Sequence, residues 1–229
     1  MAGHADPGPH GLRLRAIPEA SVARLAGYLR ALSHCDTAVH STISSEELAL
    51  LAGVNPAKLR KDLSYVGSHG TRGVGYDVTT LVQALESTLG AHEVYPVALV
   101  GVGHLGSALA GYAGFSGRGF PIRVLLDSDP AKIGSRVAGI DVSDMADAAA
   151  VCAAAEVTIG VITTPESSAQ QVADVLVDAG VRSILNFAPG CLELPDDVEV
   201  RRVDLALELQ MLAFHESRRG RPTAQLEAL

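Results

Sequence analysis

A glycine fingerprint of the form GxGxxG lies between an apolar run and a stretch with helical apolar spacing. Gly101, Gly103 and Gly106 directly follow the run Val97–Val100. In this setting the first glycine permits a tight turn, the second lets a pyrophosphate approach the backbone, and the third allows close helix–strand packing. The start of the following helix favours an anion. We therefore expect a dinucleotide to contact Gly101, Val102, Gly103, His104, Leu105 and Gly106.

A carboxylate follows this fingerprint at the spacing that a dinucleotide site requires. Asp127 ends the apolar run Ile122–Leu126 and lies 21 residues after Gly106. A carboxylate there accepts hydrogen bonds from the ribose 2′-OH and repels a 2′-phosphate, so the pattern favours NAD(H) over NADP(H). Lys132 and Arg136 are close in sequence and weaken that preference. The plainer interpretation is that the glycines only turn a strand into a helix and that the aspartate is a solvated strand end.

The second half of the chain alternates apolar runs with helical stretches, among them the alanine-rich Ala146–Ala155. Such alternation indicates βαβ units and a parallel sheet that is covered on both faces. We therefore predict an α/β fold with a Rossmann-like parallel-sheet domain over residues 91–204. Thr163 and Asn186, next to the ends of two later runs, complete the predicted cofactor site. The expected strands are Val97–Val100, Ile122–Leu126, Val157–Ile162 and Ser183–Phe187.

Catalysis by this domain has little support in the sequence. Hydride transfer needs a proton donor beside the carbonyl and usually a cationic clamp for the substrate. His104 lies inside the glycine loop and His215 on the last helix, and neither has an Asp or Arg companion at a motif spacing. We predict no catalytic residues. An NAD-dependent oxidoreductase with an accessory N-terminal domain is the alternative, and a CoA- or nucleotide-binding interaction protein is a third possibility.

The first half of the chain carries the signals of a helix-turn-helix. Apolar residues recur at helical spacing over 18–32, and Ser44 with Glu47 forms a capping-box pattern that opens a second helix. A turn containing Gly53 then leads to Pro56, which can stand in the first turn of a third helix. The glycine-rich segment Gly67–Tyr76 suits a tight hairpin. We therefore predict a winged-helix domain over 18–90, with the helix-turn-helix at about 28–67 and a further helix over 77–89.

Basic residues gather on the third helix and in the predicted wing. The second helix of a helix-turn-helix enters the major groove, and arginine at a wing tip can enter a narrow minor groove. Residues 1–90 contain eight basic and eight acidic residues, so the net charge of −8 comes from residues 91–229. The alternative is a solvated face on a protein-contact domain. The predicted DNA contacts are Lys58, Arg60, Lys61, Ser64 and Arg72.

The composition is that of a soluble globular chain rather than a membrane or disulfide-rich one. Apolar residues make up 48%, and no apolar run is long enough to cross a bilayer. Residues 1–11 are rich in Gly, Pro and His, and we expect residues 1–17 to form a disordered tail rather than a signal peptide. Cys35, Cys152 and Cys191 are widely separated, which favours a reducing cytoplasm and argues against a metal site.

Four blocks of the chain resemble the Rex family of bacterial redox-sensing transcriptional repressors. They are Arg60–Gly67, Gly70–Tyr76, Gly103–Gly106 and Ile184–Pro189, and the similarity runs from about residue 18 to residue 216. The first two blocks are specific to that family. The resemblance implies a homodimer whose two winged-helix domains read a palindromic double-stranded operator. It also implies that NAD⁺ permits DNA binding, whereas NADH closes the dimer and releases the DNA.

The resemblance further implies a swapped C-terminal helix and a switch. Residues 205–229 would hold that helix, at Leu205–Ser217, and a tail, with Leu205, Leu209, Leu212 and Phe214 as apolar anchors. Such an apolar face independently suggests a partner. Leu205 stands where some members place a phenylalanine against the partner's nicotinamide, so less ring contact is available at this position.

The switch maps onto three residues of this sequence. Arg30 resembles the arginine that pairs with an aspartate in the DNA-binding form, and Asp204 resembles that aspartate. Tyr112 resembles the tyrosine that captures the aspartate when NADH is bound. One carboxylate with two alternative partners is a two-state element that a ligand can bias. Without the resemblance, Arg30 would be interpreted as a surface charge and Tyr112 as a core residue.

Overall fold

The computed structural model describes residues 17–33, 41–67, 70–71 and 73–219. The chain divides into two compact units, Met1–Glu93 and Val94–Leu229. Residues 1–16 of the predicted tail, Cys35 and Arg72 lie outside the described residues, as do residues 220–229.

The first unit contains the predicted helix-turn-helix. Ser44 Oγ accepts a hydrogen bond from Glu47 N at 3.1 Å, and the Glu47 carboxylate accepts one from Ser44 N at 2.9 Å, which confirms the capping box. Asn55 caps the next helix and Pro56 stands at its start. The elements are α1 (Glu19–Leu32), β1 (Thr42–Ile43), α2 (Ser45–Leu51), α3 (Pro56–Leu63), the 3₁₀ turn η1 (Ser64–Val66), β2 (Tyr76–Asp77) and α4 (Val78–Leu89).

The wing differs from the predicted hairpin in its strand partner. β2 pairs antiparallel with β1, which precedes α2, and within the glycine-rich segment only an isolated bridge joins Thr71 to Gly75 among the described residues. Gly75 has a φ of 99°, and a Cβ there would lie 2.3 Å from the carbonyl oxygen of Ile43. The two strands are too short to produce an alternating pattern, which is why the sequence did not indicate β1.

An apolar core joins the four helices of this unit that the structure describes. Leucines from each helix are at most 1% exposed, and this burial supplies the main stabilisation. They are Leu25 and Leu32 of α1, Leu48 of α2, Leu59 and Leu63 of α3, and Leu81 and Leu85 of α4.

A carboxylate lies at the edge of this core, between α3 and α1. Asp62 is 1% exposed. Arg24 Nε donates to Asp62 Oδ2 at 2.6 Å, Arg24 Nη2 donates to Oδ1 at 2.7 Å, and Tyr28 Oη donates to Oδ2 at 2.8 Å. Burial alone would raise the pKa of the Asp62 carboxyl, but the hydrogen bonds from Arg24 and Tyr28 outweigh it and lower that pKa. We call these three residues the Asp62 cluster.

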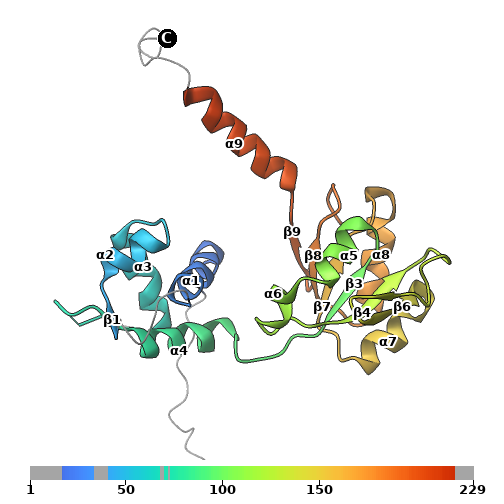
Figure 1. Cartoon of the computed structure of the whole chain (residues 1–229), viewed down its shortest axis with the longest axis horizontal. Helices are drawn as coiled ribbons and strands as arrows, with labels where there is room; N and C mark the ends of the chain where they lie inside the picture. Colours follow the sequence, from blue (N-terminus) through green and yellow to red (C-terminus); the bar gives the residue numbers. More distant parts are fainter. Residues whose placement is uncertain (1–16, 34–40, 68–69, 72, 220–229) are drawn as a thin grey trace, which may run out of the picture. The chain divides into compact units, whose positions relative to one another are not determined.

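The second unit is built on a mostly parallel sheet (Figure 1). Its described part holds seven strands in the order β5-β6-β4-β3-β7-β8-β9, with only the β5–β6 pair antiparallel. The predicted α/β class is therefore confirmed. The strands are β3 (Val97–Val100), β4 (Ile122–Asp127), β5 (Arg136–Val137), β6 (Ile140–Asp144), β7 (Ile159–Ile162), β8 (Ser183–Asn186) and β9 (Glu199–Arg202).

Helices cover both faces of this sheet, as the alternating pattern predicts. The helices α7 (Ala148–Ala154) and α8 (Glu166–Asp178) contribute to one buried cluster with β3, β4 and β7. The short helices α5 (His104–Ala110) and α6 (Ala113–Ser116) pack on the other face. Strands β5, β6 and β9 were missed because they lie toward the sheet edges and carry polar residues such as Asp141 and Arg201.

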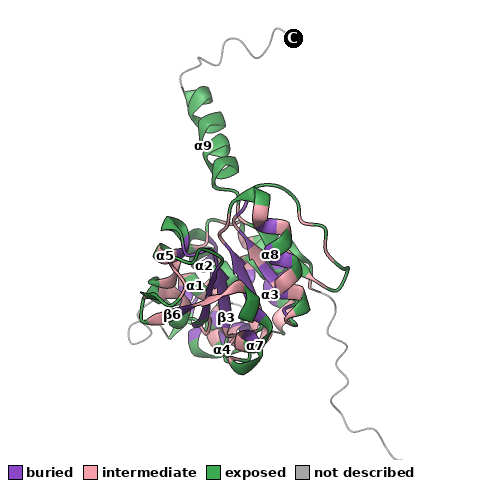
Figure 2. Ribbon diagram, turned by 90° about the vertical axis from the view of Figure 1, so that its right-hand side faces the viewer, coloured by how far each residue is buried: buried purple, intermediate pink, exposed green. Residues whose placement is uncertain are grey.

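The last helix, α9 (Leu205–Arg219), is exposed along its whole length (Figure 2). It ends two residues later than the predicted helix. In the described part of the chain, no helix combines the length and the apolar character that a membrane span requires.

Tyr28 allows the Asp62 cluster to be tested at alkaline pH. Burial, together with the hydrogen bond to Asp62, raises the pKa of Tyr28 to about 12, whereas an unfolded tyrosine titrates at about 10. The raised pKa stabilises the folded state below about pH 10, and this stabilisation is lost as the pH rises to about 12. We expect the melting temperature to fall across this window, and to fall less in Tyr28→Phe.

The measurement is thermal unfolding followed by circular dichroism between about pH 9 and about pH 12. Tyr112→Phe is the matched control, because Tyr112 is 52% exposed, and it should keep the slope of the unmodified chain. Parallel profiles for Tyr28→Phe and the unmodified chain would contradict the assigned role of the hydroxyl.

Candidate dinucleotide site and nucleic-acid interface

The predicted cofactor residues lie at the carboxyl ends of four neighbouring strands. The glycine loop follows β3, Asp127 ends β4, Thr163 follows β7 and Asn186 ends β8. These strands are neighbours and parallel, in the order β4-β3-β7-β8, so their carboxyl ends lie side by side. From β3 the chain runs outward through β4 to β6 and then crosses back through α7 to β7, on the other side of β3. This is the switch point at which ligands bind in open α/β sheets.

The three glycines of the fingerprint have different reasons to be glycine. Gly101 has a φ of 95°, and a Cβ there would lie 2.8 Å from Thr164 Cγ2. A Cβ at Gly106 would lie 2.0 Å from the carbonyl oxygen of Gly101 and 2.9 Å from Thr163 Oγ1. The fold itself therefore requires both. Gly103 is exposed and has no atom within 4 Å of its Cβ position, so the space beside it is free for a ligand.

Asp127 connects the end of β4 to the glycine loop. Its carboxylate, 7% exposed, accepts hydrogen bonds from Val102 N at 2.7 Å, Asp129 N at 2.9 Å and Lys132 Nζ at 3.0 Å. Burial would raise the pKa of Asp127, but these three donors lower it, so the group is ionised at neutral pH. A carboxylate can accept about four hydrogen bonds, which leaves one acceptor position for a further donor.

The two cations near Asp127 in sequence separate in the structure. Lys132 pairs with Asp127 and offsets part of its charge. Arg136 instead donates from Nε to Gly139 O at 3.0 Å, within its own β5–β6 hairpin.

Thr163 contacts the backbone of the glycine loop, whereas Asn186 contacts the backbone of the segment that follows β8. Thr163 Oγ1 lies 2.7 Å from Gly101 O and 2.9 Å from Val100 O. Asn186, 1% exposed, exchanges hydrogen bonds with the backbone of Ala188. Sequence reasoning missed Thr164, whose Oγ1 is the buried side-chain polar atom without a hydrogen-bond partner among the described residues. Its position after a parallel strand was the only available signal.

The remaining loop residues differ in exposure. Val102 is buried and its N–H is used by Asp127, whereas His104 and Leu105 are exposed at the start of α5.

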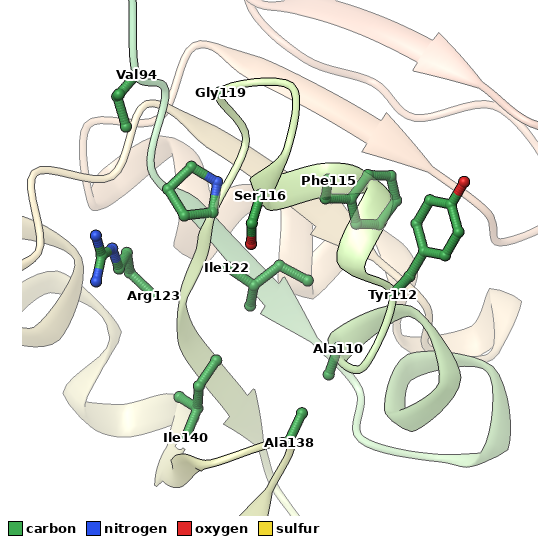
Figure 3. Close-up of a pocket in the computed structure, with 11 residues that line it drawn as sticks. Val94, Ala110, Tyr112, Phe115, Ser116, Gly119, Ile122, Arg123, Ala138 and Ile140 are labelled. Atoms are coloured by element: carbon green, nitrogen blue, oxygen red, sulfur yellow. The ribbon is translucent and has the colours of Figure 1, made fainter.

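A cavity of about 520 Å³ lies elsewhere in this unit, near the beginning of β4 (Figure 3). None of the predicted cofactor residues lines it, but Tyr112 does, with its hydroxyl pointing away from the other lining residues. The Tyr112 ring packs edge-to-face on Phe115 and covers Gly114, where a Cβ would lie 2.5 Å from the ring. At 52% exposure Tyr112 is not a core residue.

The other two switch residues lie at helix ends. Arg30 is exposed in the last turn of α1. Asp204 precedes α9, and its Oδ1 accepts hydrogen bonds from Ala206 N at 3.0 Å and Leu207 N at 3.1 Å. Arg30 belongs to the first unit, whereas Tyr112 and Asp204 belong to the second.

The helix α3 presents an exposed basic face and a buried face. Lys58 and Lys61 are exposed, and Ser64, just after the helix, donates to Lys61 O at 2.6 Å. Arg60 is engaged within the motif, since its Nη1 lies 3.2 Å from Glu46 Oε1 and 3.1 Å from Ser45 Oγ of α2.

Comparison with known proteins connects both units to one family. A protein-family model described as "CoA binding domain" matches residues 92–190, and one described as "Putative DNA-binding protein N-terminus" matches residues 16–64. The redox-sensing transcriptional repressor Rex of Streptomyces griseus is 58% identical, over 91% of this chain and 82% of the relative. Rex of Chloroflexus aurantiacus is 44% identical, over 88% of this chain and 95% of the relative.

Solved structures agree with these relatives. RSP, described as a Rex-family repressor, was solved in complex with NAD⁺ and operator DNA. That structure superposes with a TM-score of 0.81 at 33% identity, covering 87% of this chain and 92% of RSP. The RSP complex with NADH gives a TM-score of 0.78 at 32% identity, covering 87% and 94%. With a helix-turn-helix unit and a Rossmann-like unit in the same order, the chain belongs to the Rex family of redox-sensing transcriptional repressors.

Proposed function

We propose that this protein represses transcription by binding operator DNA and leaves the operator when NADH binds. The observation that carries the proposal is the pairing, in one chain, of an exposed basic face on α3 with an open glycine loop at the sheet switch point. Because operator DNA lies in the bacterial cytoplasm, we place the protein there as well.

The residues at the carboxyl ends of these strands fit a dinucleotide. Gly103 leaves room for a pyrophosphate, and Asp127 has one acceptor position left for a ribose hydroxyl. Thr164 has a buried hydroxyl that finds no hydrogen-bond partner in the part of the chain that the structure describes. The ionised Asp127 favours NAD(H) over a 2′-phosphorylated cofactor. When bound, NAD(H) supplies a nicotinamide ring whose charge depends on its oxidation state. Thr163 keeps the loop in position through Gly101 O, and Asn186 keeps the backbone after β8 in position through Ala188.

The redox direction follows from the relatives. RSP was solved with NAD⁺ and operator DNA together, and separately with NADH. We infer that the oxidised cofactor is compatible with DNA binding in this chain and that NADH opposes it. A regulator of this kind needs no turnover, and we assign no catalytic role to His104 or His215, which are both exposed.

Residues of α3 and the wing would make the DNA contacts. Lys58 and Lys61 point outward from the helix and suit phosphates or guanine edges. Ser64 would contact phosphate, and Arg72 would enter the minor groove. Arg60 would exchange its exposed pair with Glu46 for a phosphate, which costs little because exposed ion pairs are weak.

A second copy of the chain would complete the protein. The helix α9 exposes six large apolar side chains, which are Leu205, Leu207, Leu209, Met211, Leu212 and Phe214. Their spacing places them on more than one face of the helix, which suits insertion between two surfaces. An apolar groove of about 340 Å³ on the sheet, lined among others by Phe115, Val161 and Leu185, is also open. We propose a homodimer that exchanges α9.

In this dimer the Asp204 carboxylate would pair with either Arg30 or Tyr112. The carboxylate also caps α9, so its charge and its capping role coincide in one group. Pairing with Arg30 would favour the DNA-binding form, and pairing with Tyr112 the NADH form.

A DNA-binding titration tests the proposed function directly. Fluorescence anisotropy of a labelled palindromic promoter fragment should show binding in NAD⁺, and NADH should raise the apparent Kd by about tenfold or more. DNA release by NAD⁺ with retention in NADH would reverse the assigned direction. Hydride transfer to a small carbonyl compound, without operator binding, would support the oxidoreductase alternative.

Gly103 separates ligand binding from folding. Gly103→Ala adds a methyl group to free space, so we expect an unchanged melting temperature and an NADH affinity lowered by about tenfold or more. Gly111→Ala is the matched control, since its nearest atoms would lie 3.8 Å from the new Cβ, and it should keep both properties. Unaltered NADH affinity in Gly103→Ala, measured by NADH fluorescence, would place the pyrophosphate elsewhere.

Two substitutions of Asp204 separate its charge from its cap. Asn caps helices as well as Asp does, whereas Ala loses about 1 kcal/mol of capping. We expect Asp204→Asn to keep the melting temperature and to lose DNA release by NADH. Asp204→Ala should lose both the release and some helix stability. Retained release in Asp204→Asn would show that the charge is not part of the switch.

A further inference from the structure

We propose that the Asp62 cluster makes α1 and α3 move as one body. A displacement of α1, which carries Arg30, would then displace α3, which carries the predicted DNA contacts. Asp62 would then be a positioning residue for operator binding. This inference rests on the proposed function, in which α1 carries the switch residue Arg30. It assigns a role to an acidic residue that sequence reasoning did not single out.

The anchored residue and the predicted DNA contacts lie on opposite faces of the same short helix, α3. Lys58 and Lys61 lie on the exposed face, whereas Leu59, Asp62 and Leu63 lie on the buried one. Asp62 directly follows Lys61, so any shift of the anchored carboxylate moves a predicted DNA contact with it.

The hydrogen bonds of Asp62 add a directional constraint to the apolar packing of α3. Leu59 and Leu63 are fully buried, but the hydrophobic effect that buries them is non-directional. The Arg24 guanidinium, by contrast, donates two parallel hydrogen bonds at 2.6 and 2.7 Å to the two oxygens of Asp62. Such a fork satisfies both oxygens at only one relative position of the helices.

Burial makes separation of the two helices costly. Asp62 has a side-chain exposure of 2%, so withdrawal of Arg24 would leave a charge inside the protein without its partner. Tyr28 donates a third hydrogen bond from the same helix. Arg24 also donates from Nη2 to Ser21 Oγ at 3.1 Å, which fixes the guanidinium to α1 itself. The cluster therefore holds α3 to α1 in one register.

A single uninterrupted helix connects the cluster to the switch. Arg24 and Tyr28 lie in the middle of α1, and Arg30 lies in its last turn. A rigid helix carries a displacement from one end to the other. The ion pair that joins α3 to α2, Arg60–Glu46, is exposed on both sides and is therefore weaker than the buried fork between Asp62 and Arg24. We therefore expect α3 to follow α1.

The test compares operator binding in NAD⁺ and NADH for the full chain and three variants. Asp62→Asn removes the charge, Arg24→Lys removes the fork, and Tyr28→Phe removes one hydrogen bond while both Arg24 bonds remain. The measured quantity is the ratio of the operator Kd in NADH to that in NAD⁺. We expect this ratio to fall about fivefold or more in Asp62→Asn and Arg24→Lys, and by less in Tyr28→Phe.

Leu85→Val is the matched control, because Leu85 is buried in the same core on α4 and forms no part of the cluster. Leu85→Val should lower the melting temperature and leave the Kd ratio unchanged. If the cluster had only a structural role, the three cluster variants would behave in the same way. A ratio kept in all three variants would overturn the inference. Absence of any NADH effect in the unmodified chain would instead overturn the proposed function.

Discussion

Two buried carboxylates, Asp62 and Asp127, hold the two functional surfaces in place, because neither can lose its donors without leaving a charge away from water. Asp62 joins α3 to α1 through Arg24 and Tyr28. Asp127 joins β4 to the glycine loop through Val102 N. In each unit the buried carboxylate adds a directional interaction to the packing that positions the backbone of the functional surface.

The features that the sequence predicted well are those encoded locally. The capping box of Ser44 and Glu47, the proline that begins α3 and the glycine fingerprint after β3 each lie within a few residues of the structure that they determine. The strands β6 and β9 carry too many polar residues to produce an apolar run. The switch residues came from family resemblance alone, since no spacing connects Arg30 to Asp204.

Long-range contacts explain what sequence reasoning missed at the sites. Asp62 lies 38 residues from Arg24, so its burial depends on a helix packing that no local pattern shows. Asp127 was predicted as a ribose acceptor, but three protein donors already use most of its capacity. Thr164 lies next to Gly101 only because β3 and β7 are neighbours in the sheet, and no local pattern indicates this contact.

The apolar surface of α9 would limit how readily the proposed dimer exchanges its subunits. Subunits that exchange this helix cannot part without exposing six large apolar side chains to water. Subunit exchange between existing dimers would therefore be slow, and a separated subunit would have little stability of its own. Newly made chains would pair mainly with one another, so a dimer would retain the two subunits with which it was assembled.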